Sequence, residues 1–419
     1  MVKPDFAHLH CHSIYSVQDA IPKPKDYVDA IYRYNSDPSS KYNCTGLAIT
    51  DHGNIYALVK HYEACLNPDD KSRITKPIYG CEVYHCVDRS VEDMTQPHRY
   101  HLVLLAKNEI GLKNLYQIVS DGGINPYEGR TRNFPICDLV YMKGHGEGII
   151  ALTACIGGIV PKHILNGDED GAKYYIQELK SIFDEVYLEV QPHSMPEQLI
   201  VNDALVRLSQ ETNTELVMTS DSHYIYETDN KYHDILKDMS HQKHFDNTAK
   251  LYEPEEMEAY CTIHNIPLSC ITNTGVIANQ CNVDPKPKDH RGLLPIFDCP
   301  PGYDDNTYLR KKCLEGIKIK YEKGSISLEE IPEILDSLFY ELDVICGQGF
   351  ASYFLILWDW FDWCRNNGIL TGPGRGSAAG SIISYLLNIT KLNPIRNGFV
   401  FARFMSPYRV EFPDEFKAA

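Results

Sequence analysis

Potential metal ligands recur at short intervals along the first half of the sequence. His8 and His10 stand two residues apart in FAHLHCHSIYS, residues 6–16. Because side chains alternate along an extended strand, an H-x-H pair on a strand directs both imidazoles to one side, where they can bind one ion. A single such pair in a chain with 17 histidines is weak evidence. The case for a metal site therefore depends on the residues that follow.

The other candidate ligands share a place within or just after a short apolar run. The whole set comprises His8, His10, Asp19, His52, Glu82, His101, Cys155, Asp221 and His223. Glu82 and His101 lie inside apolar runs, where an unpaired ionisable group is costly, so a ligand role explains them well. Cys155 is a weaker candidate because buried free cysteines are common. Asp51 is interpreted as a turn or supporting residue that could cap the helix beginning near Asn54.

Mixed imidazole, carboxylate and thiol ligands in this number would serve two or three ions with open positions. Such a centre suits phosphoester hydrolysis, because one ion lowers the pKa of a bound water while others neutralise the phosphoryl oxygens. Oxidation at a single iron needs fewer ligands than this set supplies.

Short strand-like runs must position these residues. The runs alternate with segments in which apolar residues recur at helical spacing. The runs cover residues 6–12, 46–50, 77–85, 101–106, 148–154, 186–190 and 215–220. The alternation predicts parallel strands with crossover helices, either in a barrel or in an open sheet. A barrel is favoured because the carboxyl ends of its strands converge on one face, whereas an open sheet would spread the ligands along a line.

Length and composition predict a cytoplasmic protein of two or three domains. The chain has 419 residues, a net charge of -17 and 14 cysteines without a regular spacing. It shows no signal peptide and no long apolar run. The charge argues against a surface built only for nucleic acid but leaves room for a locally basic channel. We expect a first domain over 1–270, a linker rich in Pro and Asp over 271–305, and a second domain over 306–419.

The first domain resembles the PHP (polymerase and histidinol phosphatase) family. The resemblance rests on FAHLHCHSIYS, LAITDHGN, GCEVY, HLVLLAKN, LTACIGG and TSDSHY. It implies a distorted seven-stranded βα barrel with a trinuclear centre of manganese, zinc or iron, held by the nine candidate ligands above. By motif position His12 is not a ligand, and His98 and Arg99 are candidate phosphate contacts. The resemblance implies a phosphoesterase that acts as a 3′-5′ exonuclease.

A glycine-rich loop, GPGRGSAAGS at residues 372–381, precedes an apolar helix-like run in the second domain. Backbone N–H groups of such a loop can approach phosphates, and Arg375 could add bidentate contacts. The loop lacks the GK[ST] of a Walker motif, and a glycine-rich loop taken alone is more often a connector.

Residues 340–414 nevertheless resemble the beginning of the palm in bacterial C-family replicative DNA polymerases. GILTGPGRGSAAGSIISYLLNIT and FARFMSPYRVEFPD carry this resemblance. It implies an incomplete α+β palm segment with Gly374, Arg375, Gly376 and Ser377 on the triphosphate of a deoxynucleoside triphosphate. Asp414 would be the first catalytic aspartate, and Mg²⁺ would be the metal of a complete palm. The expected partners are the 3′ end of a DNA primer-template, the remaining polymerase portion and a sliding clamp, without a membrane.

The sequence departs from this family at its end. PDEF places Phe416 where the family has a second aspartate. We therefore expect an N-terminal portion of a larger polymerase that does not extend a primer by itself. Two alternatives stay open for the first domain: a free-standing phosphomonoesterase similar to histidinol phosphatase, and a scaffold whose metals are structural.

Overall fold

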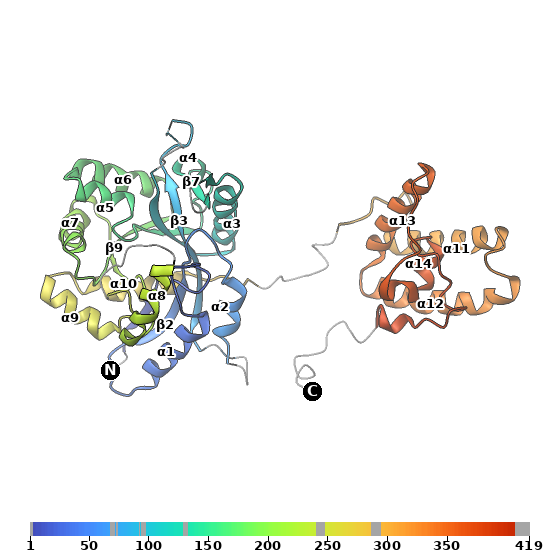
Figure 1. The fold of residues 1–419 in the computed structure, drawn as a ribbon, viewed down its shortest axis with the longest axis horizontal. Coiled ribbons are helices and arrows are strands. Elements are labelled where there is room, and N and C mark those ends of the chain that lie inside the picture. Colours follow the sequence, from blue (N-terminus) through green and yellow to red (C-terminus); the bar gives the residue numbers. More distant parts are fainter. Residues whose placement is uncertain are drawn as a thin grey trace. The chain divides into compact units, whose positions relative to one another are not determined.

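The computed structural model describes residues 3–67, 72, 74–91, 93, 98–128, 133–239, 248–285 and 295–406. The chain divides into two compact units, Met1–Pro285 and Lys286–Ala419. Figure 1 colours the first unit from blue to yellow and the second in orange and red. Residues 271–280, which we expected in a linker, belong instead to a helix of the first unit.

A curled sheet forms the centre of the first unit, and all seven expected strands are part of it. The strands run in the order β1-β2-β3-β4-β8-β9-β10, and a short β7 pairs with β3. Their bounds are β1 Asp5–His8, β2 Asn43–Ile49, β3 Lys76–Cys86, β4 Tyr100–Ala106, β7 Ile136–Asp138, β8 Ile149–Leu152, β9 Glu185–Val190 and β10 Leu216–Met218. Separately, β5 Tyr127–Glu128 pairs antiparallel with β6 Asn133–Phe134. The βα barrel class predicted from the sequence is confirmed.

The two edges of the sheet meet just beyond the strand ends. Cys11 forms an isolated parallel bridge with Ser222, the His12 amide donates to the Ser222 carbonyl (2.8 Å), and the Ser222 amide donates to the His10 carbonyl (3.2 Å). The segments after β1 and β10 therefore complete the ring at one end of the barrel. The candidate metal ligands of both segments lie at this junction.

One strand breaks the expected parallel pattern. β4 runs antiparallel to both β3 and β8, whereas every other pair along the sheet order is parallel. Reversal brings the beginning of β4 to the end of the barrel where its parallel neighbours finish. His101 stands second in β4 and consequently faces the same end as ligands that follow other strands.

Helices surround the sheet, as Figure 1 shows for α1 to α7. Their bounds are α1 Pro24–Ser36, α2 Leu58–Ala64, α3 Glu109–Ile124, α4 Leu139–Met142, α5 Ile159–Leu165, α6 Glu169–Ile182, α7 Pro196–Thr212, α8 Asn230–Met239, α9 Pro254–His264 and α10 Ser269–Gln280. Apolar residues of α10 join the interior cluster of the barrel, together with Ala7 of β1, Leu9 just after this strand and Val217 of β10. Burial of this apolar face explains why residues 271–280 form a helix of the first unit and are not part of a linker.

The second unit contains helices and no strand among its described residues. It comprises α11 Asp305–Glu322, α12 Ile331–Gly347, α13 Ala351–Asn366 and α14 Ile382–Leu386, with short 3₁₀ turns. These helices share one apolar core that includes Leu309, Leu338, Leu355 and Ile383. The α+β character expected for this segment is therefore not seen in the part of it that the structure describes.

Among the described residues, no single helix is long and apolar enough to cross a membrane. The stretch Leu328–Gly347 passes that test only together with Ala351–Asn366, and the two are bent by 114° at their junction.

Candidate metal centre

The segment after β1 places His10 and His12, rather than His8 and His10, at the centre. Ala7 and Leu9 point into the barrel, whereas Phe6 and His8 face the surrounding helices, with their rings 4.9 Å apart. The strand ends at His8, and beyond it His10 and His12 turn toward the centre, with Nε2 atoms 3.1 Å apart. His8 lines a different pocket of about 670 Å³ beside Arg33 and Tyr34 of α1.

This placement corrects the two opening assignments of the sequence analysis. His8 does not approach the other candidate ligands, and His12, which we had left out, lies among them. An H-x-H pair does lie at the centre, but it is His10 and His12, because the alternation of side chains in β1 does not continue unbroken beyond the strand end.

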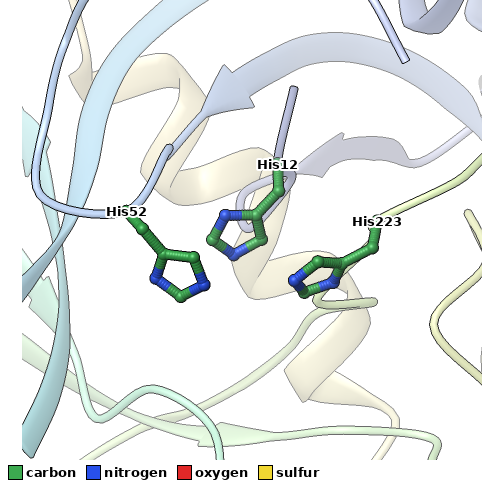
Figure 2. A group of neighbouring side chains, drawn as sticks. All are labelled: His12, His52 and His223. Carbon is green, nitrogen blue, oxygen red and sulfur yellow. The ribbon is translucent and has the colours of Figure 1, made fainter. Parts of the chain in front are cut away.

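Three imidazoles converge from distant parts of the chain, as Figure 2 shows for His12, His52 and His223. His12 Nε2 also lies 3.2 Å from Asp221 Oδ1 and 3.3 Å from Glu82 Oε2. His52 lies between two carboxylates, with Nε2 2.8 Å from Asp19 Oδ2 and Nδ1 2.9 Å from Glu82 Oε2. These rings share carboxylate neighbours, which is the arrangement needed to bridge adjacent ions.

A second side of the centre is built on β3, β4 and the loop after β8. His101 Nδ1 lies 2.9 Å from Glu82 Oε1, and Cys155 Sγ lies 3.5 Å from the same ring nitrogen. Glu82 therefore stands between His12 and His52 on one side and His101 on the other. Its side chain is 1% exposed, so its charge is stabilised by these neighbours rather than by water.

Asp19 and Asp221 complete the acidic groups of the centre. His223 Nε2 lies 3.3 Å from Asp19 Oδ2, and Asp19 Oδ1 accepts a hydrogen bond from Lys237 of α8. Asp221 has a positive φ of 46°, which for a residue other than glycine marks a constrained backbone.

The donor set fits metal ions. Ligand atoms of three groups lie within 4.8 Å of one another: His12, His52 and His223; His10, His12 and Asp221; His52, Glu82 and His101. Glu82 Oε2 and His52 Nδ1 lie 2.9 Å apart, and Asp221 Oδ1 lies 3.2 Å from His12 Nε2, but none of these buried atoms makes a hydrogen bond of suitable geometry among the described residues. Buried polar atoms that converge without such partners are costly unless a cation binds them. Eight of the nine predicted ligands lie in this neighbourhood, and His8 does not.

Asp51 supports the centre from outside, as expected. Its carboxylate accepts hydrogen bonds from the Ser13 amide (2.7 Å), the Ser13 hydroxyl (2.8 Å) and the Ser16 hydroxyl (2.8 Å). Ser16 in turn contacts His12 Nδ1 (3.0 Å) and accepts from the His52 amide (3.1 Å). The aspartate therefore holds the loop from which His12 and His52 are oriented.

A pocket of about 540 Å³ opens onto the centre. Arg99, Lys162 and Lys237 supply positive charge to its lining, and His193 also faces it. Arg99 lies over the ring of Phe134, 4.0 Å from its centroid. Of the two candidate phosphate contacts, His98 stacks on Tyr100 and is not part of this lining. His193 and Lys237 carried no sequence signal that separated them from other charged residues.

The charges of the centre shift its pKa values in opposite directions. Burial alone would raise the pKa of Glu82, Asp19 and Asp221, but the adjacent imidazoles outweigh burial and lower all three. Burial alone would lower the pKa of His10 and His52, but nearby acidic groups outweigh it and raise both well above 6.5. Among the described residues no acidic group acts on His8 in this way, and burial lowers its pKa to about 3.

These shifts predict a pH-dependent stability for the metal-free protein. Stabilisation from protonated His10 and His52 is complete below their ordinary pKa of 6.5 and is lost as pH rises through their higher folded pKa values. The Tm of the first unit in EDTA should therefore fall by a few degrees, on the order of 2–4 °C per kcal/mol, between about pH 5.5 and about pH 8.5. Saturating Mn²⁺ should reduce this fall, because metal binding requires neutral rings. A metal-free Tm independent of pH over this range would contradict the interpretation.

The glycine-rich loop lies exposed in the second unit. Gly374 (φ 101°) and Gly376 (φ 67°) adopt backbone conformations that favour glycine, and a Cβ on Gly374 would lie 2.8 Å from Thr390 Cγ2. Arg375 and Ser377 are exposed beside them. Asp414 lies outside the described residues.

Comparison with known proteins assigns both parts of the chain. Residues 8–193 match the family described as PHP domain, and residues 307–415 match the bacterial DNA polymerase III alpha NTPase domain. The first unit is thus a PHP domain, a class defined by a βα barrel of this kind.

Relatives extend the assignment to almost the whole chain. DNA polymerase III subunit alpha of Borreliella burgdorferi is 35% identical over 98% of this chain and 34% of its own length. The corresponding subunits of Aquifex aeolicus and Treponema pallidum are each 32% identical, over 98% and 99% of this chain and 36% and 34% of their own lengths. The chain is similar over almost its whole length to bacterial DNA polymerase III alpha subunits, and it spans about a third of the length of these relatives.

Among solved structures, an amidohydrolase from Chromobacterium violaceum aligns with 52% of this chain and 87% of its own, at 15% identity and a TM-score of 0.31. This likeness is too low to add to the assignment.

Proposed function

We propose that the PHP domain is a metal-dependent phosphodiesterase that removes nucleotides from the 3′ end of DNA. The observation that carries the proposal is the sharing of ligands between groups, since His12 and His52 each belong to two of the three. Adjacent ions held in this way can activate a water and neutralise a phosphodiester at the same time. Manganese, zinc and iron all suit a set of imidazoles, carboxylates and one thiol.

The residues of the chain have distinct tasks in this proposal. His10, His12, His52, His101, His223, Glu82, Asp19 and Asp221 would hold the ions, with Cys155 at the edge of the set. Arg99 and Lys162 lie where they could bind the phosphates of a nucleic acid strand. The pocket is large enough to admit more than a single phosphate, which favours an oligonucleotide over a small phosphomonoester.

A 3′-end degradation assay tests this function. Metal-free protein receives Mn²⁺, Zn²⁺ or Fe²⁺ and a primed DNA labelled at the 5′ end of the primer. We expect stepwise shortening of the primer and release of nucleoside monophosphates with at least one ion, and none in EDTA. Release of inorganic phosphate from a terminal phosphate without shortening would favour a phosphomonoesterase. Binding of metal that raises Tm without any hydrolysis would favour a structural scaffold.

For the family as a whole we propose DNA-directed DNA synthesis in a cytoplasmic replication complex, with Mg²⁺ in a complete palm. Gly374, Arg375, Gly376 and Ser377 would contact the triphosphate of the incoming nucleotide, and Asp414 would bind Mg²⁺. Primer-template DNA, the remaining polymerase portion and a sliding clamp are the partners of this proposal. The chain by itself is not expected to polymerise, because Phe416 replaces an expected ligand of Mg²⁺.

A further inference from the structure

A buried carboxylate lies behind the metal centre and takes no part in any of its ligand groups. Glu189 of β9 is fully buried. It accepts hydrogen bonds from four donors: His10 Nδ1 (2.6 Å), the Thr219 hydroxyl (2.5 Å), the Gln191 side-chain amide Nε2 (2.9 Å) and the Ala154 backbone N–H (3.0 Å). A buried charge of this kind is stable only when it is paired and hydrogen-bonded, as this one is.

The bond to His10 determines which ring nitrogen faces the centre. An ionised carboxylate only accepts hydrogen bonds, so His10 Nδ1 must carry the proton in this contact. The opposite atom, His10 Nε2, lies 3.3 Å from Asp221 Oδ1 and 3.1 Å from His12 Nε2. Neutral His10 therefore presents the lone pair of Nε2 to the centre. A carboxylate partner of this type also raises the basicity of a ligating imidazole.

The same carboxylate supports a second candidate ligand through the backbone. Ala154 has a positive φ of 61°, a conformation that costs free energy in a residue with a Cβ. Glu189 Oε2 accepts from the N–H of this residue, and the next residue is Cys155, which lies beside His101. The hydrogen bond compensates for the constrained backbone and directs the thiol toward the centre.

We propose that Glu189 is a positioning residue for the metal centre, which fixes the tautomer of His10 and the backbone that presents Cys155. Its partners come from the segments that follow β1, β8, β9 and β10, next to the junction that completes the barrel. Glu189 itself is not expected to bind an ion, because the contact with His10 and three further donors occupies its oxygens.

The inference rests on the proposed metal site, but its test measures metal affinity instead of nuclease activity. Metal-free wild-type protein and Glu189→Gln are titrated with Mn²⁺ against a competing chelator. We expect affinity to fall by about 10–100-fold, as is typical for loss of an outer partner of a ligating histidine. Glu185→Gln, on the same strand but bonded to Lys107, is the matched control and should bind Mn²⁺ like the wild type. Equal affinity of folded Glu189→Gln and wild type would overturn the proposal.

A double variant separates positioning from a general structural role. If Glu189 acts through His10, then Glu189→Gln should weaken Mn²⁺ binding less in a His10→Ala background than in the wild type. If Glu189→Gln lowers Mn²⁺ affinity by the same factor in the His10→Ala protein as in the wild type, the proposed action through His10 is overturned. Should Glu189→Gln not fold, Thr219→Val keeps the carboxylate and removes one donor, and it should lower the affinity by several-fold. Unchanged affinity in a folded Thr219→Val protein would then count against the proposal.

The outcomes for the metal site and for the function are distinct. Mn²⁺ affinity that depends on Glu189 without any nuclease activity would support the positioning role and contradict the proposed function. Nuclease activity with an Mn²⁺ affinity that does not depend on Glu189 would support the proposed function and contradict the positioning role. A wild-type protein that binds none of Mn²⁺, Zn²⁺ and Fe²⁺ would overturn both.

Discussion

Replacing His12 with alanine should lower Mn²⁺ affinity by at least about 100-fold, since loss of a ligand costs more than loss of an outer partner. His12 lies in two of the three ligand groups, so its removal should also abolish phosphodiester hydrolysis. The measurement is a chelator-competition titration on metal-free protein, followed by the 3′-end degradation assay.

The neighbouring His8 is the matched control, because it is the same residue type four positions away. His8→Ala should leave Mn²⁺ affinity and hydrolysis per folded molecule unchanged. It should instead lower the free energy of unfolding by about 2–4 kcal/mol, since it removes a buried ring that packs on Phe6. The reverse result, with His8→Ala losing the metal and His12→Ala retaining it, would restore the assignment made from motif spacing.

Replacing Glu341 with alanine should destabilise the second unit by about 3 kcal/mol or more, because it leaves three buried donors without an acceptor. Glu341 of α12 accepts from the Ser381 hydroxyl (2.7 Å) and from the backbone N–H groups of Ile382 (2.8 Å) and Ile383 (3.1 Å). These donors begin α14, directly after the glycine-rich loop. Binding of a deoxynucleoside triphosphate to that loop should weaken together with the fold.

Tryptophan fluorescence reports on this unit alone, since all three tryptophans lie in α13. Denaturant unfolding followed at this signal should shift in Glu341→Ala, while Mn²⁺ binding by the PHP domain stays unchanged. Glu333→Ala, at an exposed position of the same helix, should change stability by no more than about 0.5 kcal/mol. An unaltered unfolding midpoint in Glu341→Ala would show that the donors find other acceptors.

The same carboxyl group predicts a pH effect on the second unit. Burial raises the pKa of Glu341 to about 7, although its three donors lower it. A carboxyl group with a raised folded pKa favours the native state while protonated, so stability should fall as pH rises from about 4.5 to about 7. Glu341→Gln cannot ionise and should remove this part of the pH dependence.

Much of the fold could be predicted from local patterns. The seven main strands and their alternation with helices follow from apolar periodicity, which is a property of neighbouring residues. Most candidate ligands could also be named from the sequence. Burial of an ionisable side chain inside an apolar run costs free energy unless the group is paired or binds a metal ion, as at Glu82 and His101.

Motif spacing could not decide the register at the first strand. FAHLHCHSIYS offers two overlapping H-x-H pairs of identical spacing, so His8, His10 and His12 are indistinguishable by alternation alone. The end of β1 at His8 and the bridge from Cys11 to Ser222 select the second pair. That bridge joins residues more than two hundred positions apart, and no local pattern contains it.

Residue types and their periodicity therefore sufficed to predict the strands, the barrel class and most of the residues that gather at the candidate centre, because each depends on short stretches of chain. Three features needed the tertiary structure: the antiparallel direction of β4, the packing of α10 against the barrel interior and the place of Glu189 behind His10. Each arises from contacts between distant segments, whose free energy depends on how the barrel closes rather than on the residues alongside them in the sequence.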